Sequence, residues 1–313
     1  MSSSILVTRQ IPDSALALLR AVGRVELPAT PPAAEALREL VRGRDAVVTM
    51  LTDKVDDALL AAAGPSLKIV ANVAVGYDNI DVPAARARNV IVTNTPDVLT
   101  GAVAEFTWGL ILGITRRMAE GDRLIRRDGW KGWSFTFMTG MELSGKQLGI
   151  IGPGRIGRAV AAGASAFGMN VVFGARQSGG VIDGHPIVTI DEALATSDVV
   201  SLHVPLRPET RHLINRDAIV RMKKTAYLVN TARGPIVDEA ALAAALREGV
   251  IAGAALDVFE REPVVHPDLL PLENVLLVPH LGSATIETRT GMAELAAKNV
   301  AAVLGGQSPL TRV

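Results

Sequence analysis

Cysteine is absent from this 313-residue sequence. Without thiols the chain cannot form disulfides, iron–sulfur clusters, cysteine-ligated zinc sites or thiolate nucleophiles, so any chemistry must use other groups. The other residues that can bind metals, His, Asp and Glu, form no cluster with the spacing of metal ligands, and we therefore expect no metal site.

The sequence also lacks an excess of charge and a long apolar run. Its 32 Lys and Arg residues balance 32 Asp and Glu residues, and the pI is near 7.0. Such a chain has no global field that draws it onto nucleic acid or anionic lipid, so neither partner is expected. The apolar runs stay below the roughly 18–20 residues that span a bilayer, and Met1–Ser4 shows no basic segment leading into an apolar stretch. We expect a cytoplasmic protein.

What the sequence does have is an alternation of short apolar runs with longer segments rich in Ala and Leu. With 49% hydrophobic residues, the chain is long enough for two domains that each bury a core. This alternation is typical of βαβ units around a parallel sheet. The first pairs of strand and helix are predicted at residues 5–7 and 14–22, 46–48 and 54–63, and 69–71 and 82–88.

A second series of six apolar runs predicts a nucleotide-binding sheet. Between the two series, Thr100–Arg127 carries apolar residues at helical spacing and is predicted to be one interdomain helix. Ile286–Leu304 again has a helical pattern, and we expect it to return to the first lobe. The six runs are 148–151, 171–173, 199–202, 227–229, 254–256 and 275–278.

These patterns predict an α/β protein with two doubly wound, parallel-sheet domains of Rossmann type, the first of them discontinuous. Residues 1–98 with 286–313 form the predicted substrate-binding domain. Residues 99–285 form the predicted dinucleotide-binding domain, and the active site is expected in the cleft between the domains.

A glycine-rich loop, Gly152–Gly157, has the pattern G-x-G-x-x-G. It lies between the apolar run that ends at Ile151 and a helical run over residues 156–167, which is the context that dinucleotide binding requires. The glycines allow a tight turn, close approach to a pyrophosphate and close packing of helix on strand. A glycine turn in an unliganded domain is the alternative. The predicted cofactor contacts are Gly152, Gly154, Arg155, Ile156 and Gly157.

The segment after the second strand favours NADP(H) over NAD(H). NAD sites usually carry Asp or Glu about 20 residues beyond the glycine loop, but no acidic residue occurs from Leu143 to Ile182. Arg176 and Ser178 stand there instead. A guanidinium can grip the extra phosphate of NADP, and a hydroxyl can add a donor. The alternative is that Arg176 is merely solvated at the end of a strand.

Three residues suit the reduction of a 2-oxo acid, which needs a cation for the carboxylate, an acid for the developing alkoxide and a partner for that acid. Arg233, Glu262 and His280 each follow a predicted strand, and the carboxyl ends of parallel strands share one sheet edge. Alone, Arg233 could equally be a structural cap. The remaining histidines lack such Arg and Glu company: His185, His203, His212 and His266.

Several further motifs accompany this trio and the glycine loop. They are Asn72–Asp81, Asn230–Asp238, Ala255–Pro263, Pro279–Ser283 and Glu287–Leu295. With these motifs, the sequence resembles the D-2-hydroxyacid dehydrogenase family over essentially its whole length, and within it the glyoxylate/hydroxypyruvate reductases.

The resemblance implies roles for the trio and for the first lobe. His280 is the expected general acid, Glu262 holds the imidazolium and keeps it protonated, and Arg233 binds the carboxylate of the 2-oxo acid. In the first lobe, backbone N–H groups of Val75 and Gly76 are expected to bind that carboxylate, with Leu51 contacting the substrate.

The resemblance also implies cofactor contacts beyond the glycine loop. Asp257 is expected to orient the nicotinamide carboxamide, and Gly282 to close the nicotinamide side. Pro205 and Thr231 are expected to line the cofactor, although a turn residue and a strand terminator are equally reasonable interpretations of the two.

An aromatic segment, Trp130–Met138, holds two of the three tryptophans and two of the six phenylalanines. Aromatic clusters in a loop usually mean core or interface. In the reductases that the sequence resembles, a Trp from a neighbouring subunit reaches the active site; here Phe137 stands at that position and lacks the indole N–H. The resemblance therefore implies a homodimer formed through Thr100–Phe137.

The predicted activity is NADPH-dependent reduction of glyoxylate and hydroxypyruvate, which gives a D-2-hydroxy acid where the product is chiral. Alternatives from the same superfamily act on 2-ketogluconate, phosphoglycerate, formate or phosphite. A further alternative is a dinucleotide-sensing protein without turnover, which the intact set of Arg233, Glu262 and His280 disfavours.

Overall fold

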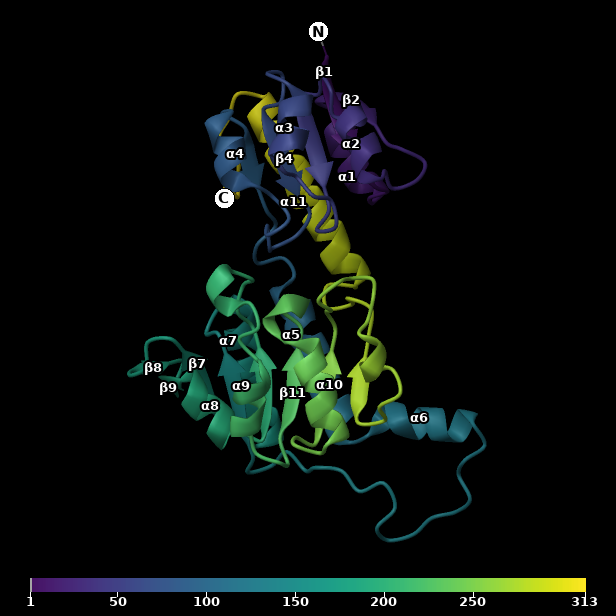
Figure 1. Ribbon diagram of the computed structural model, residues 1–313. Helices are drawn as coiled ribbons and strands as arrows, with labels where there is room; N and C mark the ends of the chain where they lie inside the picture. Colours follow the sequence, from purple (N-terminus) through teal and green to yellow (C-terminus); the bar gives the residue numbers. More distant parts are fainter. Residues whose placement is uncertain (1) are drawn as a thin grey trace. The chain divides into compact units, whose positions relative to one another are not determined.

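The computed structural model describes residues 2–313, which form two compact units, each built on a mainly parallel sheet (Figure 1). One unit comprises the chain up to Leu99 together with Ser283–Val313, and the other comprises Thr100–Gly282. The predicted fold class, two Rossmann-like domains, is confirmed. The roles assigned to the two domains stay predictions.

The first unit has a five-stranded sheet in the order β2-β1-β3-β4-β5, with all strands parallel. Every residue of β3 and β4 is buried, because helices cover a parallel sheet on both faces. The strands are β1 (Ser3–Val7), β2 (Gly23–Glu26), β3 (Ala46–Thr49), β4 (Ile69–Asn72) and β5 (Ile91–Thr93). The helices are α1 (Asp13–Arg20), α2 (Ala34–Leu40), α3 (Asp57–Ala63), α4 (Val82–Ala87) and α11 (Ile286–Leu304).

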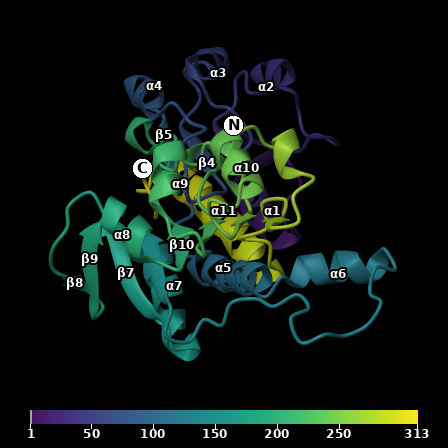
Figure 2. The ribbon, with the colours of Figure 1, turned by 60° about the horizontal axis from the view of Figure 1, so that its bottom comes forward.

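Helix α11 returns to this unit with the predicted bounds, and Figures 1 and 2 show it beside α1. Its residues Ala293, Ala297 and Val300 pack into the same core as strand β1. Buried Asn299 then holds the end of the chain: its carbonyl oxygen accepts the N–H groups of Leu310 and Thr311 at 2.8 and 3.1 Å. The C-terminal segment is therefore an integral part of the first unit.

The second unit has an eight-stranded sheet in the order β13-β12-β11-β10-β6-β7-β9-β8, in which only β8 is antiparallel to its neighbour. The prediction of six strands was wrong, because the sheet also contains β8 (Val181–Ile182) and β9 (His185–Thr189). No residue of these two edge strands is fully buried, so neither has the continuous apolar run of a central strand, and Pro186 interrupts β9 further.

The six remaining strands of this sheet match the predicted apolar runs. They are β6 (Gln147–Ile151), β7 (Asn170–Ala175), β10 (Val199–Leu202), β11 (Tyr227–Asn230), β12 (Gly253–Leu256) and β13 (Val275–Leu277). The helices are α5 (Thr100–Thr115), α6 (Met118–Arg126), α7 (Arg155–Gly163), α8 (Ile190–Thr196), α9 (Arg216–Arg221) and α10 (Glu239–Arg247), with short 3₁₀ turns at Ala164–Phe167, Pro208–Thr210, Gly234–Ile236 and Pro267–Leu269.

The single helix predicted over Thr100–Arg127 is in fact two helices. Arg117 lies between α5 and α6 in the left-handed region, with φ of 53°, and its guanidinium forms two hydrogen bonds with Glu120, at 2.6 and 2.8 Å. The chain therefore turns, and α6 leads away from α5 into a long loop that returns to β6 (Figure 1). Arg123 of α6 pairs with Glu273 at 2.7 Å and anchors the start of this excursion.

Within residues 2–313, no helix has the length and apolar character needed to cross a membrane.

Candidate active site

The glycine loop connects β6 to α7 and has the geometry of a phosphate-binding turn. Gly152 has φ of 103°, and a Cβ atom there would lie 2.9 Å from the carbonyl oxygen of His203. A Cβ on Gly157 would collide with the carbonyl oxygen of Gly152. Around Gly154, the N-cap of α7, there is open space and no acidic residue in the first turn of the helix. Gly152 and Gly157 are thus needed for close packing, whereas Gly154 leaves the helix N-terminus accessible to an anion.

Arg176 and Ser178 follow β7 and are exposed, as the NADP prediction requires. The Arg176 side chain is 73% exposed and lies 3.6 Å from the Glu209 carboxylate. That acidic neighbour comes from a distant part of the chain, so sequence reasoning missed it. Its loose, exposed pairing leaves the guanidinium able to exchange Glu209 for a phosphate.

Arg233 lies in a loop that the end of β11 shapes. Buried Asn230 donates from its side-chain amide to the carbonyl oxygen of Arg233 at 2.9 Å and accepts the N–H of Ala232 at 3.0 Å. The guanidinium itself donates to the carbonyl oxygen of Ala232 at 2.8 Å. Two residues before Arg233, the Thr231 hydroxyl lies 3.1 Å from the Thr107 hydroxyl on α5. Pro205 lies three residues after the end of β10 and is exposed.

Glu262 and His280 are brought together as the sequence predicts. One Glu262 carboxylate oxygen lies 2.8 Å from His280 Nδ1, and the other accepts the N–H of Phe259 at 3.1 Å. About a quarter of each side chain is exposed, 27% and 26%, so the pair is shielded yet reachable. Burial raises the pKa of Glu262, but the hydrogen bond and charge of His280, the Phe259 N–H and the charge of Arg233 together lower it below its ordinary value.

Asp257 holds the loop on which His280 lies. This buried carboxylate, 1% exposed, accepts the N–H groups of Leu281 and Gly282 at 2.5 and 2.9 Å. Its carbonyl oxygen accepts the N–H of His280, which has a positive φ of 54°. Burial raises the pKa of the Asp257 carboxyl, and the N–H groups of Leu281 and Gly282 oppose that rise. Sequence reasoning assigned Asp257 to the cofactor and missed this structural anchor.

Gly234 brings the Arg233 loop against the Glu262 loop. A Cβ atom on Gly234 would collide with the backbone carbonyl group of Phe259. No side chain fits between the two loops, so the distance between them depends on this glycine.

The other histidines are weaker candidates for the acid, although one expectation about them was wrong. Burial lowers the pKa of His203 to about 3, which leaves its ring neutral near pH 7 and bonded to Ser201 at 2.8 Å. His212 does have an acidic partner, since its Nε2 lies 3.0 Å from Glu260. Spacing along the chain could not show this contact, because 48 residues separate the two.

In the first unit, the predicted substrate contacts follow the ends of two neighbouring strands. Val75 and Gly76 follow β4, and Leu51 lies in the turn after β3. The side-chain amides of Asn94 and Asn72 bond the carbonyl oxygens of Val75 and Gly76 at 2.8 and 3.0 Å. Within residues 2–313, the N–H groups of Val75 and Gly76 meet no protein acceptor, which is the arrangement that an anion would need.

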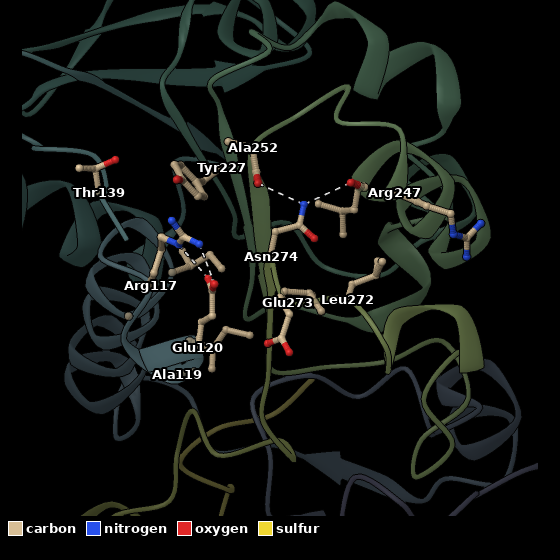
Figure 3. Close-up of a pocket in the computed structure, with 15 residues that line it drawn as sticks. Arg117, Ala119, Glu120, Thr139, Tyr227, Arg247, Ala252, Leu272, Glu273 and Asn274 are labelled. Carbon is tan, nitrogen blue, oxygen red and sulfur yellow. Dashed lines mark hydrogen bonds and ion pairs between the residues drawn. The ribbon is translucent and has the colours of Figure 1, made fainter. Parts of the chain in front are cut away.

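A cavity of about 520 Å³ lies elsewhere in the second unit, near Tyr227 and Val275, where β11 and β13 begin (Figure 3). None of the predicted catalytic residues lines it. Its charged and amide groups already have partners: Arg117 bonds Glu120, and Asn274 donates to two carbonyl oxygens at 3.2 and 3.3 Å. We therefore place the candidate active site at the opposite, carboxyl ends of the strands.

In the described part of the chain, no group of three or more His, Asp or Glu residues could hold a metal ion.

The fold and the glycine loop together define a dinucleotide-binding α/β protein, and comparison with known proteins gives its family. Residues 108–282 match the NAD binding domain of D-isomer specific 2-hydroxyacid dehydrogenases. A glyoxylate reductase of Thermofilum pendens is 49% identical, over 97% of this chain and 92% of its own. A second, from Thermococcus onnurineus, is 46% identical over 100% of this chain and 96% of its own.

Solved structures agree with these relatives. A glyoxylate reductase from Paecilomyes thermophila superimposes with a TM-score of 0.90 at 33% identity, covering 100% of this chain and 98% of its own. An NADPH-dependent glyoxylate/hydroxypyruvate reductase from Sinorhizobium meliloti, solved with NADP and malonate, has a TM-score of 0.89 at 34% identity, covering 100% of this chain and 97% of its own. The chain belongs to the D-isomer specific 2-hydroxyacid dehydrogenase family.

The contact at Gly234 yields a test of the site. Gly234→Ala must push the Phe259 backbone away and move the Glu262 loop, so we expect kcat to fall about 100-fold while circular dichroism stays unchanged. An unchanged kcat for Gly234→Ala would show that the spacing of the loops is not critical.

Proposed function

We propose that this protein reduces small 2-oxo acids, with glyoxylate and hydroxypyruvate as the foremost substrates, to D-2-hydroxy acids by hydride transfer from NADPH. The observation that carries the proposal is the Glu262–His280 pair at 2.8 Å, with the charge of Arg233 close enough to lower the pKa of Glu262. Relatives named glyoxylate reductase, 44–49% identical over at least 97% of the chain, support the substrate class.

In this mechanism each residue has one task. Arg233 binds the substrate carboxylate, and the free N–H groups of Val75 and Gly76 are proposed to bind it as well. His280 donates a proton from Nε2 to the oxygen on C2, because Nδ1 is held by Glu262. The ordinary pKa of a Glu side chain is 4.5; because the pKa of Glu262 is lower, its carboxylate stays ionised at pH 4.5 and above and is protonated only as the pH falls through the lowered pKa. A dinucleotide held in this site would supply the hydride to C2.

The residues that would hold the cofactor fit a dinucleotide. The open space at Gly154 admits a pyrophosphate to the N-terminus of α7, next to Arg155 and Ile156. Asp257, Gly282, Pro205 and Thr231 are proposed to surround the nicotinamide half. Arg176, with Ser178, is proposed to bind the 2′-phosphate and so to favour NADP(H) over NAD(H).

The activity is tested by following absorbance as NADPH or NADH is oxidised with glyoxylate, hydroxypyruvate, pyruvate or 2-ketogluconate. We expect NADPH with glyoxylate or hydroxypyruvate to give the highest kcat/KM. His280→Ala should lower kcat about 10²–10⁴-fold, since it removes the proton donor, while NADPH binding measured by fluorescence persists. Turnover of none of the four acids, or an unchanged kcat for His280→Ala, would contradict the proposal.

The cofactor preference is tested at Arg176. Arg176→Gln should raise KM for NADPH about 10- to 100-fold and leave KM for NADH nearly unchanged, because a charge-assisted bond to one phosphate is lost. Arg221→Gln provides the control: it also removes an exposed, ion-paired guanidinium, on α9. The preference is refuted if the unmutated enzyme uses NADH better, or if both variants leave KM for NADPH unchanged.

We further propose that the protein is a homodimer assembled through Thr100–Phe137. The loop after α6 exposes Trp133 by 78%, Phe135 by 87% and Phe137 by 40%, so the alternative that these aromatics lie in the core is wrong. Exposed aromatics in one loop support an interface. Phe137 of the second copy is proposed to contact the substrate. The cytoplasmic location stays a prediction.

The dimer is tested by light scattering during gel filtration. We expect the mass of two chains for the native sequence, and a dimer Kd at least about 30-fold higher for Phe135→Ser, because the variant lacks an aromatic side chain that the proposed interface would bury. Val181→Ser, which removes an exposed apolar side chain from β8, should leave the Kd unchanged. A native protein that is monomeric at micromolar concentration would refute the assembly.

A further inference from the structure

Glu239, the first residue of α10, is a buried carboxylate that the proposed mechanism does not use. Its side chain is almost inaccessible, with the residue 4% exposed, and among the described residues no Lys or Arg forms an ion pair with it. Buried acids are rare unless something compensates their charge. Here backbone N–H groups do so: the carboxylate accepts from Glu260 at 2.5 Å and from His266 at 3.2 Å.

These two N–H groups bracket the loop that carries Glu262. Glu260 precedes Glu262 by two residues and His266 follows it by four, so one carboxylate fixes both ends of the loop. Between them, the N–H of Val264 bonds the carbonyl oxygen of Arg261 at 2.8 Å, which closes the loop on itself. A loop fixed in this way has little freedom to move the Glu262 carboxylate relative to His280.

Glu260 returns the interaction to α10. One oxygen of its carboxylate accepts the N–H of Glu239 at 3.0 Å, so the two residues clamp each other. The other oxygen faces His212 Nε2 at 3.0 Å and the Arg211 guanidinium at 3.8 Å. This clamp also reaches the segment after Arg233, because the N–H of His212 bonds the carbonyl oxygen of Pro235 at 2.8 Å.

We infer that Glu239 is a positioning residue for the acid: by holding the N–H groups of Glu260 and His266, it fixes the loop on which Glu262 meets His280. This inference rests on the proposed function, since it assigns Glu239 an effect on catalysis through Glu262. Glu239 itself touches neither Glu262 nor His280 in any hydrogen bond of the described residues.

The amide isostere distinguishes this role from mere filling of space. Glu239→Gln keeps the size of the side chain but has one acceptor oxygen in place of two. That oxygen can accept the N–H of Glu260 or of His266, and the NH₂ group then faces the other N–H, so that two donors meet. One end of the Glu262 loop is then released, while the apolar packing around α10 is unchanged. The matched control is Glu248→Gln at the other end of the same helix, where the side chain is exposed.

The first measurement needs no activity. Hydrogen exchange followed by mass spectrometry should show faster exchange across residues 260–266 in Glu239→Gln than in the native protein, with no change in Glu248→Gln. Unchanged exchange in this loop would overturn the inference even if the enzyme reduces glyoxylate as proposed.

The second measurement asks whether Glu239 acts through Glu262. We expect Glu239→Gln to lower kcat about 10- to 100-fold with KM nearly constant, and to lower it far less when Glu262→Gln is already present. Multiplicative losses in the double variant, or a change confined to KM, would refute a positioning role. If the native enzyme turns over none of the 2-oxo acids, the proposed function fails, and the exchange data still decide whether Glu239 fixes the loop.

Discussion

The loops at the carboxyl ends of the strands must satisfy their own backbone N–H groups without the help of a neighbouring strand, and the site depends on how they do so. Two buried carboxylates provide the acceptors. Asp257 binds the loop that carries His280, and Glu239 binds the loop that carries Glu262. Because a carboxylate accepts from several directions at once, each acid can replace a stretch of sheet hydrogen bonding where the strands have ended.

The sequence was most informative where burial is complete on both faces. Leu148–Ile151 of strand β6 are fully buried and form a continuous apolar run, and the predicted pattern of α11 begins and ends at the residues where the helix does. The edge strand His185–Thr189 was missed because a half-exposed strand needs no such run. The break at Arg117 was missed because a left-handed residue leaves no trace in hydrophobic periodicity.

For the site, residue type and position at a strand end were enough to select Glu262 and His280, which the structure joins at 2.8 Å. The residues that hold them could not be found in this way. Glu239 looks like an ordinary acid in the first turn of a helix, where acids are common, and only the fold shows that it is buried. Glu209 and Glu260 likewise meet Arg176 and His212 across long separations in sequence.

The chain leaves the second unit immediately after the His280 loop, between Gly282 and Ser283. The two N–H groups that the Asp257 carboxylate accepts belong to Leu281 and Gly282, the last two residues of the second unit. The carboxylate therefore anchors the chain at the point where it leaves this unit. Along the chain, these hydrogen bonds lie between the His280 imidazole and the connecting segment, so a displacement of that segment would have to break them before it moved His280. His280 is in this way fixed to the second unit, which also carries Glu262.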